Sequence, residues 1–339
     1  MYQLDPAIRA QIIQRRSFRL ALFATLLSFC VVVLGAYTRL TDAGLGCPDW
    51  PTCYGHLTVP KAFQNNLINL TKAWTEMSHR YIAGLLAMLI FGLGILAIRN
   101  RRYPEQPLAL PLTLVGLVVF QAMLGMWTVT LKLFPLVVMA HLMGGLITLS
   151  LLWWLTLKLR PVQISETKID KLYSLRIWAI FGLAILMIQL ISGGWTSANY
   201  AALVCTEFPG CQGKLIPPLD FFKAFNLLSA GVIEGFGEPL DNTARVTIHM
   251  VHRLGALVTG LIIGWLAFLV FARAKSLAIR ILSVVIAVLL TLQILLGITN
   301  VLTFLPLPVA IAHNAIAALL LLSLVTLNYY LHALPRRKR

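Results

Sequence analysis

The stretch EMSHRYIAGLLAMLIFGLGILAI, residues 76–98, decides the fold of this chain. After a short polar start it is wholly apolar, and it reaches the length of about 20 residues that a helix needs to cross a bilayer. A second stretch, HMVHRLGALVTGLIIGWLAFLVF at residues 249–271, repeats this arrangement, with the dipeptide His252-Arg253 in the place of His79-Arg80. The two stretches predict membrane-spanning helices that each carry a histidine near one end.

The composition of the whole chain agrees with a membrane location. Of the 339 residues, 59% are hydrophobic and only 12% are charged, whereas a soluble domain is roughly 45–50% apolar and about 25% charged. The formal net charge of +16 does not indicate a nucleic-acid partner, because the basic residues lie in short clusters between long apolar runs. We expect an all-α integral membrane protein embedded in the lipid bilayer. Eight segments are predicted to span it: 20–38, 77–98, 108–130, 136–157, 173–195, 247–271, 279–301 and 308–331.

The distribution of Lys and Arg predicts the orientation of these spans. Most of the 28 basic residues fall at the two termini and in the segments 99–102, 158–176 and 273–280. Connections rich in Lys and Arg stay on the cytoplasmic side of a membrane. Both termini are therefore predicted to be cytoplasmic, and the long loops 39–76 and 196–246 are predicted to face outward.

Each outward loop contains a pair of cysteines, Cys47 with Cys53 and Cys205 with Cys211. Each pair spans a turn that contains proline, and disulfides persist in an oxidising compartment such as the periplasm. We predict two disulfides; zinc sites are the alternative, although neither loop contains a CxxC pair. The rest of the second loop shows no motif. Its phenylalanines could lie against the membrane surface or cover a pocket: Phe221, Phe222, Phe225 and Phe236.

The chain is an internal duplication. Residues of the first half recur at constant offsets in the second half, which is common among membrane folds. The matching positions are Gly35, Thr38, Leu45, Cys47 and Cys53 with Gly193, Thr196, Leu203, Cys205 and Cys211, and Gln121, Leu124, Gly125, Val129, Ala140 and His141 with Gln293, Leu296, Gly297, Val301, Ala312 and His313. Each half has four predicted spans, so the repeats cross the membrane in the same sense. We expect two tandem four-helix bundles, residues 1–170 and 171–339, related by a pseudo-two-fold axis along the membrane normal.

Four histidines occupy equivalent places in the predicted spans: His79, His141, His252 and His313. An ionisable side chain inside a span is costly and suggests function, although a histidine that bonds a neighbouring helix as packing is the alternative. Their pairing in both halves favours ligands that bind a haem iron from two sides. A bare zinc or copper ion needs three or four ligands. Small residues on these helices leave room for a flat macrocycle: Gly84, Gly125, Gly144, Gly145, Gly255, Gly260 and Gly297.

The halves differ beside the histidines. Glu76 stands three residues before His79, whereas His249 takes this place before His252. A carboxylate at the edge of a haem pocket suits proton transfer or the orientation of a reacting group; the alternative is a helix-start residue favoured by the helix dipole. The difference predicts a working site in the first half and a permanent redox cofactor in the second.

An arginine follows one histidine in each half, Arg80 after His79 and Arg253 after His252. Near the outer interface, these guanidinium groups can neutralise haem propionates. The alternative is that the long side chains reach lipid headgroups. The sequence leaves both interpretations open.

The chain resembles the haem A synthase family along essentially its whole length. The resemblance rests on eight spans in two halves, on paired cysteines in the outer loops, and on a set of short motifs. These motifs are TRLTDAGLGCPDWPTCYG at 38–55, Glu76-x-x-His79, Ala140-His141, His252-Arg253 and Ala312-His313.

The resemblance implies that the chain oxidises the C8 methyl group of haem O to a formyl group, giving haem A by successive hydroxylations and loss of water. It implies that His252 and His313 bind the iron of a haem b cofactor, that His79 and His141 bind the substrate haem, and that Glu76 is catalytic. The first cysteine pair is linked to activity in the family. Haem O synthase is the implied upstream partner, cytochrome c oxidase assembly receives the product, and the bacterial inner membrane is the implied location. Whether the chain forms a homo-oligomer stays open.

Two other classes of protein remain as alternatives. A dihaem b-type electron-transfer protein, a quinol oxidoreductase, would suit four histidines equally well. It would not need Glu76 in one half only, nor two cysteine loops, and its haems would commonly lie at different depths. A transporter with repeated halves would show helices broken at mid-membrane, for which the pair Gly144-Gly145 is slight support.

Overall fold

Long helices make up most of the part of the chain that the structure describes. The computed structural model describes residues 6–59, 67–103, 106–160, 172–227 and 240–333. Every helix there except the short α7 is long and apolar enough to cross a bilayer, which confirms an all-α fold with eight candidate spans. The helices are α1 (Pro6–Leu40), α2 (Leu67–Arg99), α3 (Ala109–Thr130), α4 (Pro135–Leu159), α6 (Arg176–Ala198), α7 (Phe221–Ala224), α8 (Asn242–Arg273), α9 (Leu277–Leu302) and α10 (Leu307–Ala333).

Three helices begin well before the predicted spans. Helix α1 begins at Pro6 rather than 20, α2 at Leu67 rather than 77, and α8 at Asn242 rather than 247. The added turns include polar residues, so each helix continues beyond its apolar segment. The side chain of Asp241 caps α8 by accepting a hydrogen bond of 2.8 Å from the N–H of Ala244. His79 therefore lies about three turns along its helix, not one.

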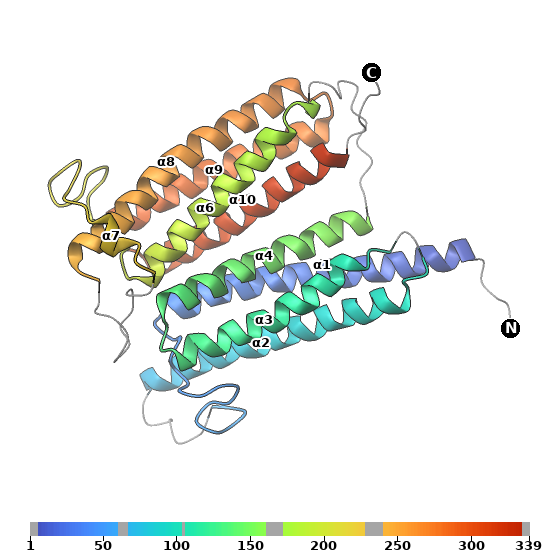
Figure 1. Ribbon diagram of the computed structural model, residues 1–339, viewed down its shortest axis with the longest axis horizontal. Coiled ribbons are helices and arrows are strands. Elements are labelled where there is room, and N and C mark those ends of the chain that lie inside the picture. The colour runs from blue at the N-terminus through green and yellow to red at the C-terminus, as the bar shows by residue number, and fades with distance from the viewer. Residues whose placement is uncertain (1–5, 60–66, 104–105, 161–171, 228–239, 334–339) are drawn as a thin grey trace.

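The eight long helices form two groups of four (Figure 1). In the first, α1 and α3 each contact α2 and α4; in the second, α6 and α9 each contact α8 and α10. The groups meet through α1 with α10, α4 with α6, and α4 with α10. Helix α6 is the counterpart of α1, and α10 is the counterpart of α4. Exchanging the two halves therefore turns the contact of α1 with α10 into that of α6 with α4, as a two-fold pseudo-symmetric interface requires. The pseudo-two-fold axis, its relation to the membrane and the division at residue 170 stay predictions, and residues 161–171 lie outside the described part.

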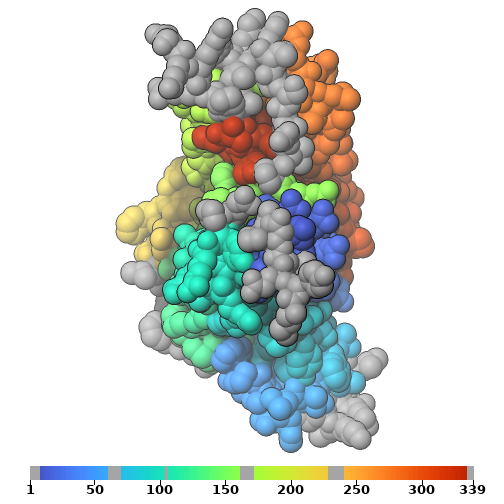
Figure 2. Space-filling view, turned by 90° about the vertical axis from the view of Figure 1, so that its right-hand side faces the viewer, coloured from blue at the N-terminus to red at the C-terminus, as the bar shows by residue number. Residues whose placement is uncertain are grey.

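A view at right angles shows the same division. The orange and red of the C-terminal helices gather in the upper part of the molecule, and the blue and teal of the N-terminal helices gather in the lower part (Figure 2). Apolar clusters fill each group away from the cysteine loops, around Ile90 and Leu155 in the first and around Ile263 and Leu321 in the second. At the loop ends the apolar clusters are smaller and include the disulfide cysteines, with Met77 in the first half and Val246 in the second.

The turns repeat between the halves as the sequence does. After α3, Lys132 and Leu133 have positive φ angles of 47° and 62°, and after α9 the equivalent Phe304 and Leu305 have 58° and 59°. Left-handed backbone at two successive residues that are not glycine is uncommon. The duplication thus extends from residue identity to backbone conformation.

Helix α7 lies in the second outward loop, where no element was predicted. Its Ala224 is fully buried, whereas Phe221, Phe222 and Phe225 are all exposed. The body of this short helix is therefore packed against the protein, and its phenylalanines face away from it. Phe236 lies outside the described residues.

Candidate functional site

Both cysteine pairs form disulfides, Cys47 with Cys53 and Cys205 with Cys211. This confirms the prediction from the sequence and overturns the zinc alternative, because a disulfide leaves no thiolate to bind the metal. The two disulfide loops lie at the same end of the molecule, one beside each helix group (Figure 1). They cover the ends of the helices that carry the histidines.

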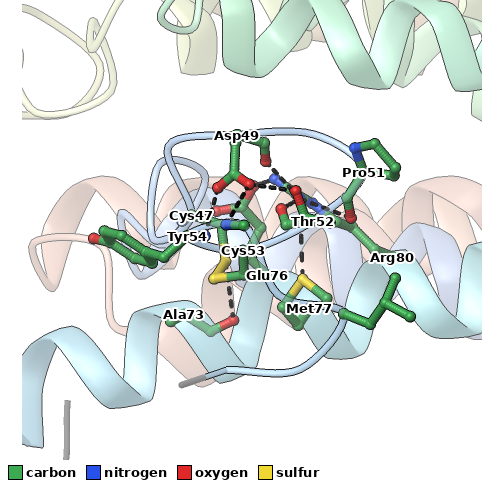
Figure 3. Close-up of a disulfide and its surroundings, with 12 residues drawn as sticks. Cys47, Asp49, Pro51, Thr52, Cys53, Tyr54, Ala73, Glu76, Met77 and Arg80 are labelled. Carbon is green, nitrogen blue, oxygen red and sulfur yellow. Dashed lines mark hydrogen bonds and ion pairs between the residues drawn. A yellow bond between two sulfur atoms is a disulfide. The ribbon is translucent and has the colours of Figure 1, made fainter. Parts of the chain in front are cut away.

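Glu76 joins the first disulfide loop to α2 (Figure 3). It is only 4% exposed, and its Oε2 accepts a hydrogen bond of 2.8 Å from the backbone N–H of Cys47. Its Oε1 forms an ion pair with Arg80. Arg80 in turn donates from Nη1 to the carbonyl oxygens of Asp49 (2.8 Å) and Thr52 (2.7 Å). Charge-assisted hydrogen bonds on both oxygens hold the carboxylate in one orientation.

The helix-dipole explanation for Glu76 does not apply. Because α2 begins at Leu67, no acidic residue lies in its first turn. The electrostatic benefit of a helix start falls off within one turn. The position of Glu76 is instead determined by its bonds to Cys47 and Arg80.

The second half lacks the carboxylate. At the equivalent place, His249 is buried and its Nδ1 has no hydrogen-bond partner among the described residues. Arg253 therefore bonds the second loop directly, from Nη2 to the carbonyl of Cys205 (2.9 Å) and from Nη1 to those of Glu207 (2.8 Å) and Gly210 (2.7 Å). The two arginines act as clamps on their disulfide loops, a contact that the sequence analysis did not foresee because carbonyl acceptors carry no sequence signature.

The carboxylate of Asp49 holds the first disulfide loop together by hydrogen bonds within the loop. Asp49 accepts hydrogen bonds from the Thr52 hydroxyl, from the N–H of Tyr54 (2.5 Å) and from the N–H of Gly55 (2.9 Å). Partial burial acts to raise the pKa of Asp49, but the bonds from Thr52, Gly55 and Tyr54 together outweigh it and hold that pKa below its ordinary value. The loop is therefore most stable with Asp49 ionised.

Each of the four predicted histidine ligands lies against a glycine of the neighbouring helix. A Cβ placed on any of these glycines would lie between 3.0 and 3.4 Å from the Cε1 atom of the ring. The pairs are Gly35 with His79, Gly125 with His141, Gly193 with His252, and Gly297 with His313. We call them the glycine seats. They bring the backbone of one helix to the edge of an imidazole on the next.

The glycine seats change part of the expectation that small residues leave room for a flat macrocycle. Gly144 and Gly255, expected to make room for a macrocycle, face the side chains of glutamines instead. Gly35 and Gly193, which the sequence identified only as repeated positions, are the seats on α1 and α6. Spacing along a helix does not reveal which glycine meets a ring on another helix.

The ring nitrogens give the test of whether a haem fits. The Nδ1 atoms of His79, His141 and His313 are buried without a hydrogen-bond partner in the described part of the chain, a situation that costs about 1–3 kcal/mol for each group. In each half the two rings are close enough to interact electrostatically. Partly buried imidazoles that lie near one another in each half, with their ring edges against glycines, fit the ligation of a haem iron.

Two glutamines place their amide nitrogens beside ring nitrogens of the second histidine pair. The amide nitrogen of Gln189 lies 3.1 Å from Nδ1 of His252, and that of Gln293 lies 3.1 Å from Nε2 of His313. In the first half, Gln121 matches Gln293, but its amide nitrogen is buried without a partner in the described structure. Among the described residues, no three His, Cys, Asp or Glu side chains gather as a metal-binding group. Neither glutamine contact was foreseen from the sequence.

Arg39, within the motif that follows the first span, links the two halves. Its Nη2 donates to the carbonyl of Ser197 (2.8 Å), and its guanidinium lies 4.1 Å from the centre of the Tyr200 ring. A cation over an aromatic face contributes about 0.5–1 kcal/mol at an exposed site. This contact joins the end of α1 to the end of α6.

Eight candidate spans, two disulfide loops and a histidine pair in each half define a multi-pass membrane protein with two related internal sites. Residues 18–325 match the family described as cytochrome oxidase assembly protein, and the chain belongs to that family. It is 46% identical over 325 residues to the heme A synthase of Shewanella oneidensis, covering 92% of this chain and 95% of the relative. It is 27% identical to those of Nitrosospira multiformis (90% of each chain) and Flavobacterium johnsoniae (91% and 95%). The resemblance found in the sequence is thereby confirmed.

Proposed function

We propose that this protein is a haem A synthase of a bacterial inner membrane, which oxidises the C8 methyl group of haem O to a formyl group. The observation that carries the proposal is the 46% identity, over nearly the full length of both chains, to the heme A synthase of Shewanella oneidensis. Haem O synthase would supply the substrate, and cytochrome c oxidase assembly would consume the product. Both chain termini would lie in the cytoplasm, on the side of the Lys and Arg clusters.

The second histidine pair is the proposed cofactor site. His252 and His313 would hold the iron of haem b, which supplies one-electron redox chemistry when bound. Gln189 lies beside Nδ1 of His252 and can orient that ring while leaving Nε2 for the iron, whereas Gln293 lies beside Nε2 of His313 and would have to turn away for that nitrogen to bind iron. Arg253 is clamped to its loop, and its remaining N–H groups are the ones that could meet a propionate.

The first histidine pair is the proposed substrate site, with Glu76 as its catalytic carboxylate. His79 and His141 would bind the iron of haem O. Glu76 lies one turn from His79 on the same helix face, and its oxygens are fixed by Cys47 and Arg80. A carboxylate held in this way can accept or return a proton at Oε1 without first having to reorient.

Pigment analysis tests the function. The protein is expressed together with haem O synthase in a host that lacks haem A. The haems are then extracted, separated and identified by mass spectrometry. We expect haem A in these cells and none in cells that express a His79→Ala variant. Bound haem b without any haem A from the intact protein would contradict the proposal and favour a dihaem electron-transfer protein.

A further inference from the structure

One face of α6 contacts the ring of His252 at two neighbouring atoms. The Cε1 atom lies against Gly193, where a Cβ would come within 3.0 Å of it. The amide nitrogen of Gln189 lies 3.1 Å from the Nδ1 atom. Gln189 and Gly193 are one helical turn apart and therefore share a face of α6, which packs beside α8 (Figure 1). The other ring nitrogen, Nε2, is left for an iron.

A glycine on α8 makes the position of Gln189 possible. A Cβ built on Gly255 would lie only 2.2 Å from Oε1 of Gln189, so any larger residue there would displace the amide. Gly255 lies one turn after His252 and hence on the same face of α8 as the ring. The amide nitrogen of Gln189 also donates to the backbone carbonyl of His252 (3.0 Å). Gln189 is thus anchored over Gly255 while it meets the ring.

The first half lacks both members of this pair. At the offset of the repeated glycine seats, Val31 takes the place of Gln189. At the offset of the repeated histidines, Ile82 takes the place of Gly255. A valine side chain cannot form a hydrogen bond with an imidazole, and an isoleucine carries the Cβ that an amide would meet. In agreement, Nδ1 of His79 is buried without a hydrogen-bond partner in the described part of the chain. The glycine seat of the ring is repeated between the halves, but its polar partner is not.

The glutamine beside His313 has a different relation to its ring. The amide nitrogen of Gln293 lies 3.1 Å from Nε2 of His313, the nitrogen that an iron would need. Its counterpart Gln121 is present in the first half, so a glutamine at this position does not distinguish the two sites. Of the two glutamines beside the second pair, only Gln189 both leaves Nε2 free and is replaced by an apolar residue in the first half.

An amide can serve this ring before and after iron is bound. A histidine that binds iron through Nε2 carries its proton on Nδ1 and donates it to a neighbouring acceptor. The last torsion of a glutamine is soft and roughly two-fold, and a half-turn about it exchanges the donor nitrogen with the acceptor oxygen. Because Gly255 leaves room for either end of the amide, Gln189 can accept from Nδ1 of His252 once Nε2 is bound. Such a bond fixes the orientation of the ring and raises the basicity of the ligand.

We propose that Gln189, anchored over Gly255, is a positioning residue that fixes His252 as a lasting ligand of haem b. Val31 and Ile82 leave the first pair without this support, so that its haem can be released. The identity of the haem at each pair rests on the proposed function. A substrate must exchange at every turnover, whereas a cofactor must stay. The hydrogen-bond partner of a ligating histidine changes metal affinity by about 10–100-fold, a difference that separates a site that exchanges its haem from one that retains it.

The positioning role is tested by the release of haem b rather than by turnover. Purified protein in lipid nanodiscs, isolated with haem b, is mixed with excess apomyoglobin, and the transfer is followed by absorbance. Gln189→Val, which installs the residue of the first half, and Gly255→Ala, whose Cβ displaces the amide, are each expected to release haem b about tenfold faster. Gly264→Ala, on the same helix, is the matched control, since its Cβ would meet only Leu290 at an ordinary 3.8 Å. The double variant should behave as Gln189→Val alone, because both changes act through one contact.

The reduction potential separates a positioning role from simple packing. Gln189→Val removes the partner of Nδ1 and is expected to raise the midpoint potential of haem b, whereas Gln189→Glu supplies a stronger acceptor and is expected to lower it. Unaltered release of haem b by Gln189→Val, or shifts of both potentials in the same direction, would overturn the positioning role. Unaltered release by Gly255→Ala would overturn the anchoring of the amide. So would a further increase when Gly255→Ala is added to Gln189→Val, because Gly255 would then make room for the haem itself.

The difference between the halves is tested by moving the pair. Val31→Gln combined with Ile82→Gly is expected to slow the transfer of haem O from the first site to apomyoglobin about tenfold, with the release of haem b unchanged. An unaltered rate for haem O would overturn the assignment of the difference to this pair. If the variants release haem b as expected but the unaltered protein forms no haem A in cells, the positioning role stands and the proposed function fails. If haem A forms and Gln189→Val retains haem b, the function stands and the positioning role fails.

Discussion

The backbone N–H of Cys47 donates a 2.8 Å hydrogen bond to the carboxylate of Glu76, so the first disulfide loop and the first histidine helix meet at a single buried group. The second half has no corresponding contact, because His249 stands in the place of Glu76. The first loop is therefore joined to its histidine helix through a carboxylate, whereas the second loop is joined to its histidine helix through Arg253. The predictions below use this difference between the halves as an internal control.

Glu76→Gln tests the carboxylate itself. The amide oxygen can still accept the bond from Cys47, but the negative charge opposite Arg80 is lost. We expect haem A formation to fall by about 10² or more, the usual contribution of a general acid or base, while haem b stays bound. Extracted haem A and the haem b absorbance are measured on the same membranes. His249→Gln at the equivalent position is the control, and equal activity of Glu76→Gln and the unaltered protein would remove Glu76 from the mechanism.

Arg80→Lys and Arg253→Lys test the loop clamps. A lysine has a single nitrogen, so it cannot bond the loop carbonyls from one nitrogen and Glu76 or Cys205 from a second, as the guanidinium does. Each hydrogen bond lost to a charged group is worth about 1.5–3 kcal/mol. We expect limited reductant to open Cys47–Cys53 faster in Arg80→Lys and Cys205–Cys211 faster in Arg253→Lys, with the other disulfide unchanged in each variant. Alkylation of the freed thiols, followed by mass spectrometry of the loop peptides, gives both rates. Equal effects on both loops would indicate general loosening of the protein.

Gly193→Ala and Gly35→Ala test the glycine seats. The new Cβ would lie 3.0 Å from the His252 ring or 3.1 Å from the His79 ring, and overpacking of this kind costs about 1–3 kcal/mol. Gly193→Ala is expected to lower the amount of bound haem b, whereas Gly35→Ala should keep haem b and lose product. Bound haem is measured by its absorbance per protein. Gly116→Ala, where a Cβ meets nothing within 4 Å, is the control and should change neither quantity.

Acid should loosen the first disulfide loop through Asp49. Because the pKa of this carboxyl is lowered in the folded protein, its contribution to loop stability is complete above the unfolded value of about 3.9 and is lost as the pH falls through the lower folded value. We expect hydrogen exchange at the amides of Tyr54 and Gly55, corrected for intrinsic rates, to accelerate only below about pH 4. Asp49→Asn should exchange faster at neutral pH and lose this dependence. A pH profile that Asp49→Asn leaves unchanged would assign the loosening to another group.

The sequence was sufficient for features that depend on composition and repetition. Hydropathy located the eight helices, and the repeated cysteines predicted both disulfides, because each signal is local or recurs at a fixed offset. The start of α2 was misplaced by ten residues, since polar turns can extend a helix beyond the apolar segment. Helix α7 was missed because four residues carry too little periodicity to be recognised.

The contacts that build the site could not be predicted in the same way. The partner of Glu76 is a backbone N–H and the partners of Arg80 are backbone carbonyls, and every residue offers these groups whatever its identity. The seat of His79 on Gly35 depends on which helices are neighbours and how closely they approach. Sequence repetition identified Gly35 as a repeated position, but its contact with the His79 ring follows only from the packing of α1 against α2.

The contact of Arg39 with Ser197 bears on the ancestry of the chain. The two residues hold equivalent positions in the repeats, in line with the equivalent cysteines and glycines. In a dimer of identical subunits, both positions would have to carry the same residue, and two arginines facing each other would repel. Fusion of the two copies into one polypeptide removes that constraint, since each copy can then mutate alone. A cation on one side and a backbone carbonyl acceptor beside a neutral side chain on the other is an interface that two identical subunits cannot form.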